Sequence, residues 1–194
     1  MSHSPVVVIL GGPNGAGKST AAARFLPPAM AFLHADEIAK GLPSYPSSRA
    51  DLDAGRILIE EMELLERERA DFAVETNLAS RSLAARAARL RASGYLFRLI
   101  FIWSPDVEFS IARVAARVRS GGHAIPEETI RRRYSAGVRN FFQIYQPLAD
   151  IWEVHDNIEV DGFRLIADGE MGGAESIHLT EVWQAFWEAG HEQC

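Results

Sequence analysis

A short apolar run that breaks into glycines is the feature that most constrains this chain. Residues 6–10 are continuously apolar and rich in β-branched side chains, which is typical of a strand buried on both faces of a parallel sheet. Residues 11–17 contain four glycines and a proline, and Lys18-Ser19-Thr20 follows. A strand that turns through glycines into a helix directs backbone N–H groups at one point. The pattern therefore predicts an α/β fold with an anion-binding loop.

This loop matches G-x-x-x-x-G-K-[ST], the P-loop motif, in the strand–turn–helix context that the motif requires. Lys18 would neutralise the β- and γ-phosphates of a nucleotide, and the Ser19 hydroxyl would ligate Mg²⁺. The sequence thus predicts ATP and Mg²⁺ as cofactors, against the alternative of a glycine-rich turn with a surface lysine. The residues of this segment predicted to bind nucleotide are Gly12, Pro13, Asn14, Gly15, Ala16, Gly17, Lys18, Ser19 and Thr20.

Strand and helix patterns alternate along the rest of the chain. Strands are predicted at about 31–33, 72–76, 95–103 and 151–154, and helices at about 49–69, 83–93, 105–120, 126–141 and 179–189. Ser104 is the predicted N-cap of the helix that Pro105 opens. Alternation favours a mainly parallel five-stranded sheet flanked by helices, a P-loop NTPase/kinase fold. Residues 160–163 predict a C-terminal hairpin before the last helix, and residues 1–194 are predicted to form a single domain.

Composition limits the class of partner. The chain of 194 residues is 47% hydrophobic and 24% charged, and its net charge of −6 argues against nucleic acid as a partner. No apolar run approaches the ~20 residues of a membrane helix, and the N-terminus lacks a signal-peptide pattern. One cysteine excludes an internal disulfide. A cytoplasmic protein without a membrane partner is expected.

Two carboxylates follow predicted strands and are candidate acceptor-site residues. The carboxyl ends of parallel strands meet at one edge of a sheet, so Asp36 and Glu75 should approach the loop. Asp36 could orient an acceptor hydroxyl and take its proton, or cap a helix. Glu75 could hold a magnesium-bound water or the acceptor hydroxyl, or serve in a cap or ion pair. Asn77 and Arg81 follow Glu75 within reach of the same substrate.

A basic island lies in the second half of the acidic chain. Residues 111–140 hold seven arginines against two glutamates, which indicates a local anion site. Arg113 and Arg117 lie four apart on one helix face, and Arg132 lies in the next helix. A helical lid over about 111–140 could bring arginine to the transferred phosphate; a solvated helix face is the alternative. Asn157, after the fifth predicted strand, could contact the nucleotide base or form a turn.

Several segments together resemble the zeta toxin family of P-loop kinases, especially its chromosomal, stand-alone members. They are "GGPNGAGKST", "FLHADEIAKGL", "FAVETNLASR", "IARVAARVRSGGHAIPEETIRRRY" and "HDN", in this order over about residues 6–157. The resemblance implies an α/β kinase fold and phosphorylation of a sugar hydroxyl of UDP-N-acetylglucosamine. It also implies an antitoxin partner.

The resemblance assigns roles residue by residue. It implies Lys18 and Ser19 for ATP–Mg²⁺, Asp36 as the base, Glu75 for the acceptor and Arg113 as the lid arginine that contacts phosphate. Three departures stand out: His34 replaces a frequent Asn, Asn77 replaces a Thr, and residues 131–133 would supply the second phosphate-contacting arginine. Two other functions remain open, namely a kinase for an antibiotic, nucleoside or free sugar, and an ATP-binding switch or partner module with little turnover.

Overall fold

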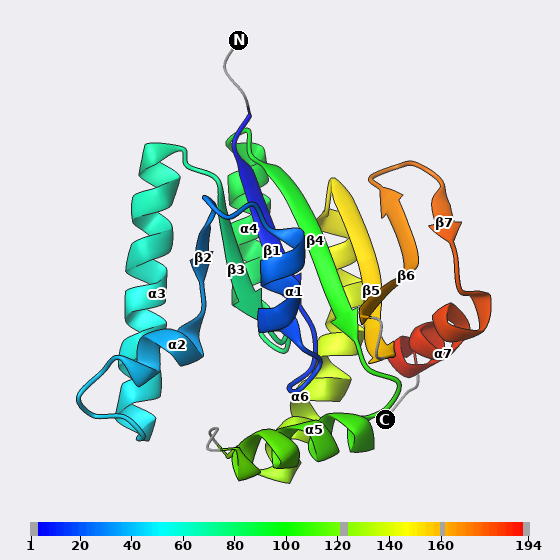
Figure 1. Cartoon of the computed structure of the whole chain (residues 1–194). Helices are drawn as coiled ribbons and strands as arrows, with labels where there is room; N and C mark the ends of the chain where they lie inside the picture. The colour runs from blue at the N-terminus through cyan, green and yellow to red at the C-terminus, as the bar shows by residue number, and fades with distance from the viewer. Residues whose placement is uncertain (1–3, 121–123, 160–161, 192–194) are drawn as a thin grey trace.

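A central sheet with helices on both faces organises the computed structural model, which describes residues 4–120, 124–159 and 162–191 (Figure 1). The strands are β1 (Val6–Gly11), β2 (Ala31–Leu33), β3 (Phe72–Thr76), β4 (Leu96–Trp103), β5 (Ile151–Glu159), β6 (Gly162–Glu170) and β7 (Glu175–Ile177). The helices are α1 (Lys18–Phe25), α2 (Ala35–Lys40), α3 (Ser48–Glu68), α4 (Ser82–Ala92), α5 (Val107–Arg119), α6 (Glu127–Asn140) and α7 (Thr180–His191). A π-helical turn, Phe141–Tyr145, and a 3₁₀ turn, Gln146–Leu148, follow α6.

The strand order in the described part of the chain is β2-β3-β1-β4-β5-β6-β7. Strands β2 to β5 pair in parallel, whereas β6 and β7 pair antiparallel. The predicted mainly parallel sheet flanked by helices is confirmed, but its count of five strands is wrong. The hairpin predicted as a small appendage instead extends the sheet, because β5 and β6 are each nine residues long and pair along most of their length. Residues 160 and 161 of its turn lie outside the described residues.

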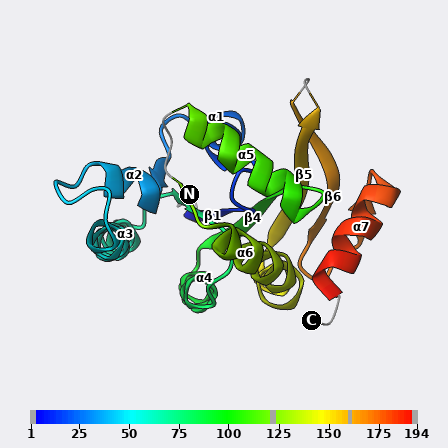
Figure 2. The same ribbon diagram turned by 90° about the horizontal axis from the view of Figure 1, so that it is seen from below.

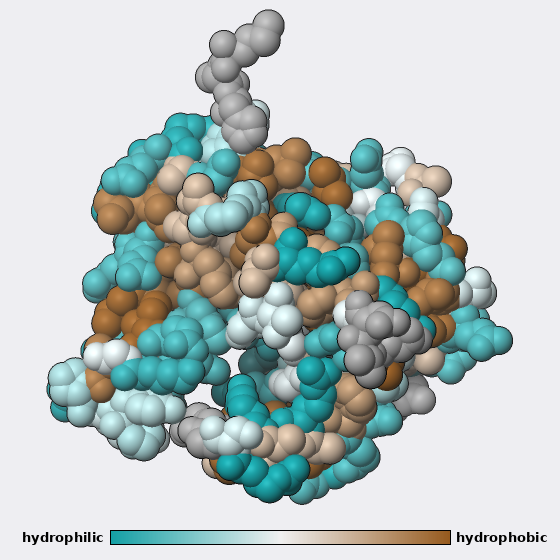
Figure 3. All heavy atoms as spheres, viewed as in Figure 1, coloured by the Kyte–Doolittle hydropathy of each residue, from teal (hydrophilic) through white to brown (hydrophobic). Residues whose placement is uncertain are grey.

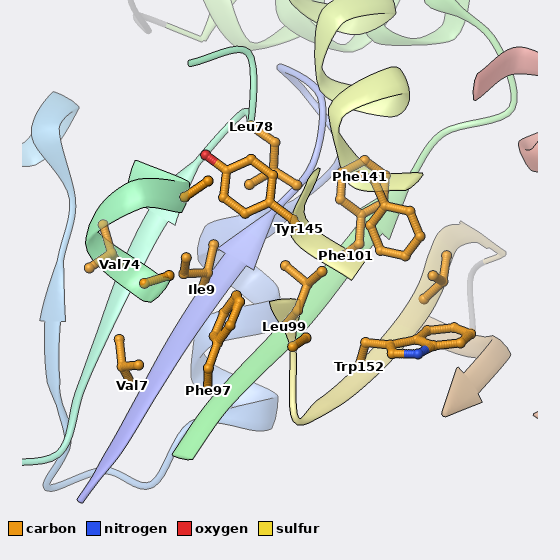
Figure 4. Close-up of a cluster of buried hydrophobic side chains, with 14 of the residues drawn as sticks. Val7, Ile9, Val74, Leu78, Phe97, Leu99, Phe101, Phe141, Tyr145 and Trp152 are labelled. Atoms are coloured by element: carbon orange, nitrogen blue, oxygen red, sulfur yellow. The ribbon is translucent and has the colours of Figure 1, made fainter. Parts of the chain in front are cut away.

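The helices form a layer on each face of the sheet. Seen from below, α1 lies on one side of the strands and α4 and α6 on the other, with α7 beside β6 (Figure 2). Helix α5 lies below the carboxyl ends of the strands, and α2 and α3 lie beside β2 (Figure 1). In β1, Val7 and Ile9 enter the larger core cluster, while Val8 and Leu10 enter the smaller one against α1. Figure 4 shows the larger cluster, in which side chains of β1, β3 and β4 meet Phe141, Tyr145 and Trp152. The central strand is therefore buried on both faces, as its apolar run predicts.

Two local features of the helices concern the sequence predictions directly. The N-cap of α5 is Asp106, whose carboxylate accepts a hydrogen bond from the Phe109 N–H. The prediction of Ser104 as the cap is wrong, because its hydroxyl is buried against that of Ser110, 2.8 Å away. In the described residues, no helix has both the length and the apolar character needed to cross a membrane.

Helix α6 lies close to the chain segment that follows β3, and a glycine permits the approach. A Cβ atom at Gly137 would lie 2.3 Å from the backbone oxygen of Asn77, whereas one at Gly55 in α3 would meet nothing within 4 Å. We expect Gly137→Ala to destabilise the protein by about 1–3 kcal/mol through overpacking. Gly55→Ala should stabilise it by about 0.5–1 kcal/mol, because alanine is the better helix former. Urea unfolding of both variants tests this; a stabilised Gly137→Ala variant would contradict the described packing.

Candidate active site

The glycine-rich loop connects β1 to α1 at the carboxyl edge of the parallel strands. Gly12, Gly15 and Gly17 have φ angles of +146°, +81° and +95°, a region that side chains strongly disfavour. A Cβ at Gly12 would also lie 2.3 Å from the Ile102 backbone oxygen of β4. The loop therefore depends on glycine both for its turn and for its fit against the sheet. Its conformation is compatible with a ring of backbone N–H donors at the N-terminus of α1.

Lys18 begins α1 and is only 8% exposed. Its ammonium group donates hydrogen bonds to the carbonyl oxygens of Gly12 and Pro13, at 2.9 and 3.0 Å. Burial lowers the pKa of Lys18, and the carboxylates of Glu75 and Asp36 oppose this effect. The only other lysine of the chain, Lys40, lies on α2 and pairs with Glu37. Lys18 is thus a cation held inside the loop.

Glu75 is the centre of the polar network beside the loop. One carboxylate oxygen accepts a hydrogen bond from the Ser19 hydroxyl at 3.2 Å, and the other lies 3.6 Å from Lys18 Nζ and 3.3 Å from His34 Nε2. Its side chain is 9% exposed. The register explains the convergence, because Leu10 of β1 pairs with Glu75 of β3. The side chains that follow the parallel strands therefore lie together, as predicted, and they interact through a network of ion pairs.

Asp36 lies in the first turn of α2, at the rim of this network. Its Oδ2 atom is 3.8 Å from His34 Nε2, and its side chain is 68% exposed. The His34 imidazole lowers the pKa of Asp36 to about 2, and the charges of Lys18 and Arg117 contribute further lowering. The N-cap position of α2 belongs to His34, so the alternative role of Asp36 as the cap is not what the structure shows. An ionised, accessible carboxylate faces the loop.

Removing the imidazole should restore the ordinary titration of Asp36. We expect His34→Ala to raise the pKa of Asp36 from about 2 towards 3.8, because the carboxylate loses its nearest positive partner. Any stability that ionised Asp36 contributes is present above pH 3.8 and is lost as the pH falls towards 2. Carboxyl-carbon NMR titration measures the shift. His178→Ala, which removes the partner of Asp168 near the opposite sheet edge, is the matched control.

An open cavity of about 490 Å³ begins at this network and continues between α3 and α4. Figure 3 shows the surface hollowed in this part of the molecule, between α2 and α5. The polar end of the cavity is lined by Asn14, Lys18, His34, Asp36, Glu75 and Asn77. Its apolar wall is formed by Leu58, Ile59, Met62, Val74 and Leu83. The volume and mixed lining are those of a small-molecule site.

Arginines line the cavity at positions that differ in part from those predicted. Arg86 and Arg89 of α4 and Arg133 of α6 reach it, whereas Arg81 and Arg132 are exposed and are not among its lining residues. Arg86 is held by Glu63 and Glu66 of α3. The sequence analysis missed Arg86 and Arg89. The sequence could have indicated both residues through their spacing from Leu83, because this spacing places all three side chains on one side of the helix.

Helix α5 covers the other side of the loop. A Cβ at Gly15 would lie 3.0 Å from the Ser110 backbone oxygen and 3.1 Å from Arg113 Cβ, so this helix packs directly on the loop. Arg113 donates to the Asn157 carbonyl oxygen at 2.9 Å. The side chain of Arg117, one turn further, is exposed, and its charge acts on both Lys18 and Asp36. The structure thus brings Arg113, Arg117 and Asn157 to the P-loop.

The residues present fit a magnesium nucleotide. The Ser19 residue is exposed and its hydroxyl faces Glu75, a donor set that suits Mg²⁺ because this ion keeps water and phosphate oxygens as most of its ligands. Within the described ranges, no group of three or more His, Cys, Asp or Glu side chains could hold a metal by itself. Magnesium here would require the nucleotide phosphates.

Together, the parallel sheet, the P-loop and the helices above it define a P-loop kinase fold. A family model described as an AAA domain matches residues 7–136, and the chain belongs to this family. A relative in Haemophilus influenzae (strain Rd), described only as an uncharacterized protein, is 32% identical over 123 residues, which are 63% of this chain and 88% of the relative.

Solved structures support the fold. A chain of the AvrRxo1-ORF1:AvrRxo1-ORF2 complex with sulphate ions superposes with a TM-score of 0.73 at 16% identity, over 94% of this chain and 63% of that chain. The same complex with ATP gives a TM-score of 0.71. This chain therefore spans less than two thirds of the AvrRxo1 chain it resembles. A chain of the PezAT chromosomal toxin–antitoxin system of Streptococcus pneumoniae has a TM-score of 0.65 at 17% identity, with 97% and 86% of the two chains covered.

Proposed function

We propose that this protein is an ATP- and Mg²⁺-dependent kinase that phosphorylates a hydroxyl group of a small molecule in the cytoplasm. One observation carries the proposal: an accessible carboxylate, Asp36, lies at the mouth of a cavity that opens onto the buried Lys18 of the P-loop. A nucleotide-binding module alone has no use for this acceptor space or for a carboxylate at its entrance. Phosphoryl transfer requires both.

The residues divide the reaction between them. The loop and Lys18 hold the triphosphate, and Ser19 would hold a Mg²⁺ ion that would neutralise charge on the phosphate oxygens. Asp36 orients the acceptor hydroxyl, whose oxygen forms a bond to the γ-phosphorus while the bond from that phosphorus to the β–γ bridging oxygen breaks. The hydroxyl proton passes to Asp36 late in the step, because a carboxylate with a pKa of about 2 is a weak base. Glu75 keeps Lys18 and Ser19 in place.

Lid arginines complete the charge stabilisation in this proposal. Helices α5 and α6 act as the lid of a single domain, with Arg113 and Arg117 on the loop side and Arg133 at the cavity. Residues 121–123 of the predicted lid lie outside the described residues. Arginine opposite the transferred phosphoryl group stabilises charge that develops in the transition state. Arg133 replaces Arg132 as the candidate from α6, because Arg133 lines the cavity and Arg132 does not.

We propose a UDP-amino-sugar, with UDP-N-acetylglucosamine first, as the acceptor. The ordered resemblance to zeta toxins supports this, as does a fold shared with a chain of the PezAT toxin–antitoxin system. The cavity also supports this acceptor, because its apolar wall suits the flat uracil ring and its arginines suit the diphosphate. The PezAT structure belongs to a toxin–antitoxin system, and the AvrRxo1-ORF1 structure contains AvrRxo1-ORF2 as well, which supports the further proposal of an antitoxin-like protein partner.

Mass spectrometry of UDP-N-acetylglucosamine, incubated with ATP, Mg²⁺ and the protein, tests the acceptor. A gain of one phosphate mass, absent with Lys18→Ala, is the expected result. No gain despite ATP binding would contradict this acceptor. An unbiased screen of antibiotics, nucleosides and free sugars would then decide between another kinase substrate, which the Asn77 departure favours, and a nucleotide-binding switch without turnover.

A further inference from the structure

Asn157 closes on the P-loop at a position that only glycine permits. Its side-chain amide donates to the Ala16 carbonyl oxygen at 3.4 Å, and a Cβ at Gly17 would lie 2.3 Å from Asn157 Nδ2. The backbone oxygen of Asn157 accepts the hydrogen bond from Arg113 of α5. One residue at the end of the sheet therefore contacts both the nucleotide loop and the helix above it.

The strand geometry explains how Asn157 reaches the loop. Residue Asp156 is the last of β5 to pair with β4, opposite Trp103. On the other side, the β5–β6 register shifts between Asp156 and Glu159, which marks an irregularity at Asn157 and Ile158. A bulge of this kind re-aims a side chain and is frequent beside functional sites. Asn157 is thus directed away from the regular ladder and onto the loop.

An ion pair with a buried carboxylate fixes the residue immediately before this irregularity. Asp156 is completely buried, and Arg164 of β6, its cross-strand partner, binds both carboxylate oxygens at 3.0 and 2.7 Å. This ion pair is weak evidence for a gain in stability, because the carboxylate loses its hydration while the Arg164 side chain stays 34% exposed. A two-point arginine–carboxylate contact does fix geometry. Because the ion pair lies one residue before Asn157, it fixes the end of β5 that carries Asn157.

We propose that Asp156 and Arg164 are positioning residues for the ATP site, acting through Asn157. The ion pair holds the end of β5 so that Asn157 joins the Gly17 segment of the P-loop to Arg113 on α5. The β5–β6 hairpin then determines how tightly the loop binds a nucleotide, although Arg164 lies on β6, the strand of the hairpin farther from the loop. This inference rests on the proposed ATP site but not on any particular phosphate acceptor.

Calorimetric binding of ADP and of a non-hydrolysable ATP analogue, both with Mg²⁺, tests the proposal without an acceptor. Asn157→Ala keeps the backbone oxygen that Arg113 uses but removes the contact to the loop, so the dissociation constants should rise about tenfold. Arg164→Lys keeps the positive charge near Asp156 but loses the two-point geometry, so they should rise about threefold. Thermal unfolding confirms that each variant is folded.

The double variant separates positioning from general structural damage. If Arg164 acts through Asn157, adding Arg164→Lys to Asn157→Ala should weaken binding no further. Arg98→Lys is the control, because Arg98 also binds a carboxylate through two guanidinium nitrogens, here at a single oxygen of Glu153 between β4 and β5, and this variant should leave binding unchanged. Wild-type affinity in Asn157→Ala, or a further threefold loss in the double variant, would overturn the proposal. Nucleotide binding without phosphorylation of any acceptor would count against the kinase function alone.

Discussion

An Asp36→Asn variant is expected to lose about a thousandfold in kcat while it binds a non-hydrolysable ATP analogue within about twofold of the wild type. The amide matches the carboxylate in size and remains beside His34, but it cannot accept the hydroxyl proton or hold the hydroxyl by a charge-assisted bond. Asp36 contacts none of the loop residues that hold phosphate in the described network. Its loss should therefore affect transfer and leave nucleotide binding intact.

Steady-state kinetics with the proposed acceptor, together with calorimetry, measure both quantities. Glu37→Gln is the matched control, because Glu37 follows Asp36 on α2 but is engaged by Lys40, and its kcat should stay at the wild-type value. Normal turnover by Asp36→Asn would remove Asp36 from the mechanism and direct attention to Glu75, the other carboxylate that lines the cavity.

A Lys18→Ala variant should reduce kcat by about 10²- to 10³-fold, the scale of one lost electrostatic contact in the transition state. It should also weaken ATP-analogue binding by about tenfold, unlike Asp36→Asn. The reason is the position of Lys18, which is the buried cation between the loop carbonyl oxygens and Glu75. Its removal leaves the Glu75 carboxylate without the positive charge of Lys18.

Lys40→Ala provides the control for charge as such, since these two residues are the only lysines in the chain. It removes the same net charge from an exposed ion pair with Glu37, and both kcat and nucleotide affinity should remain unchanged. Equal losses in the two lysine variants would indicate a general electrostatic effect and would contradict a specific role for Lys18.

The polar end of the cavity could be predicted because it depends on short-range sequence signals. The glycine spacing defines the loop, and the parallel sheet places strand ends together. These two rules bring Lys18, Ser19, Asp36 and Glu75 to one place, and the structure does the same. His34 was noted only as a departure from a family pattern. Its contacts with two carboxylates require coordinates.

The far part of the cavity and the sheet edge depend on packing between distant segments, which one sequence does not encode locally. Arg86 looks like a residue of a solvated helix surface until α3 supplies Glu63 and Glu66. Arg132 and Arg133 are neighbours in sequence, and only the rotation of α6 on the Asn77 backbone decides which one lines the cavity. The additional strands escaped prediction because a hairpin turn alone does not show whether its arms join a sheet.

Both outer strands of the seven-stranded sheet, β2 and β7, have three residues each. An unpaired strand edge is a template on which another polypeptide can add by backbone hydrogen bonding, and a short edge is a poor template. Helices α2 and α3 lie next to β2, and the N–H groups of His178 and Leu179 bond to Ile166 beyond the end of β7. We therefore expect the protein to resist edge-to-edge aggregation and to stay dispersed at high concentration, despite a sheet this wide.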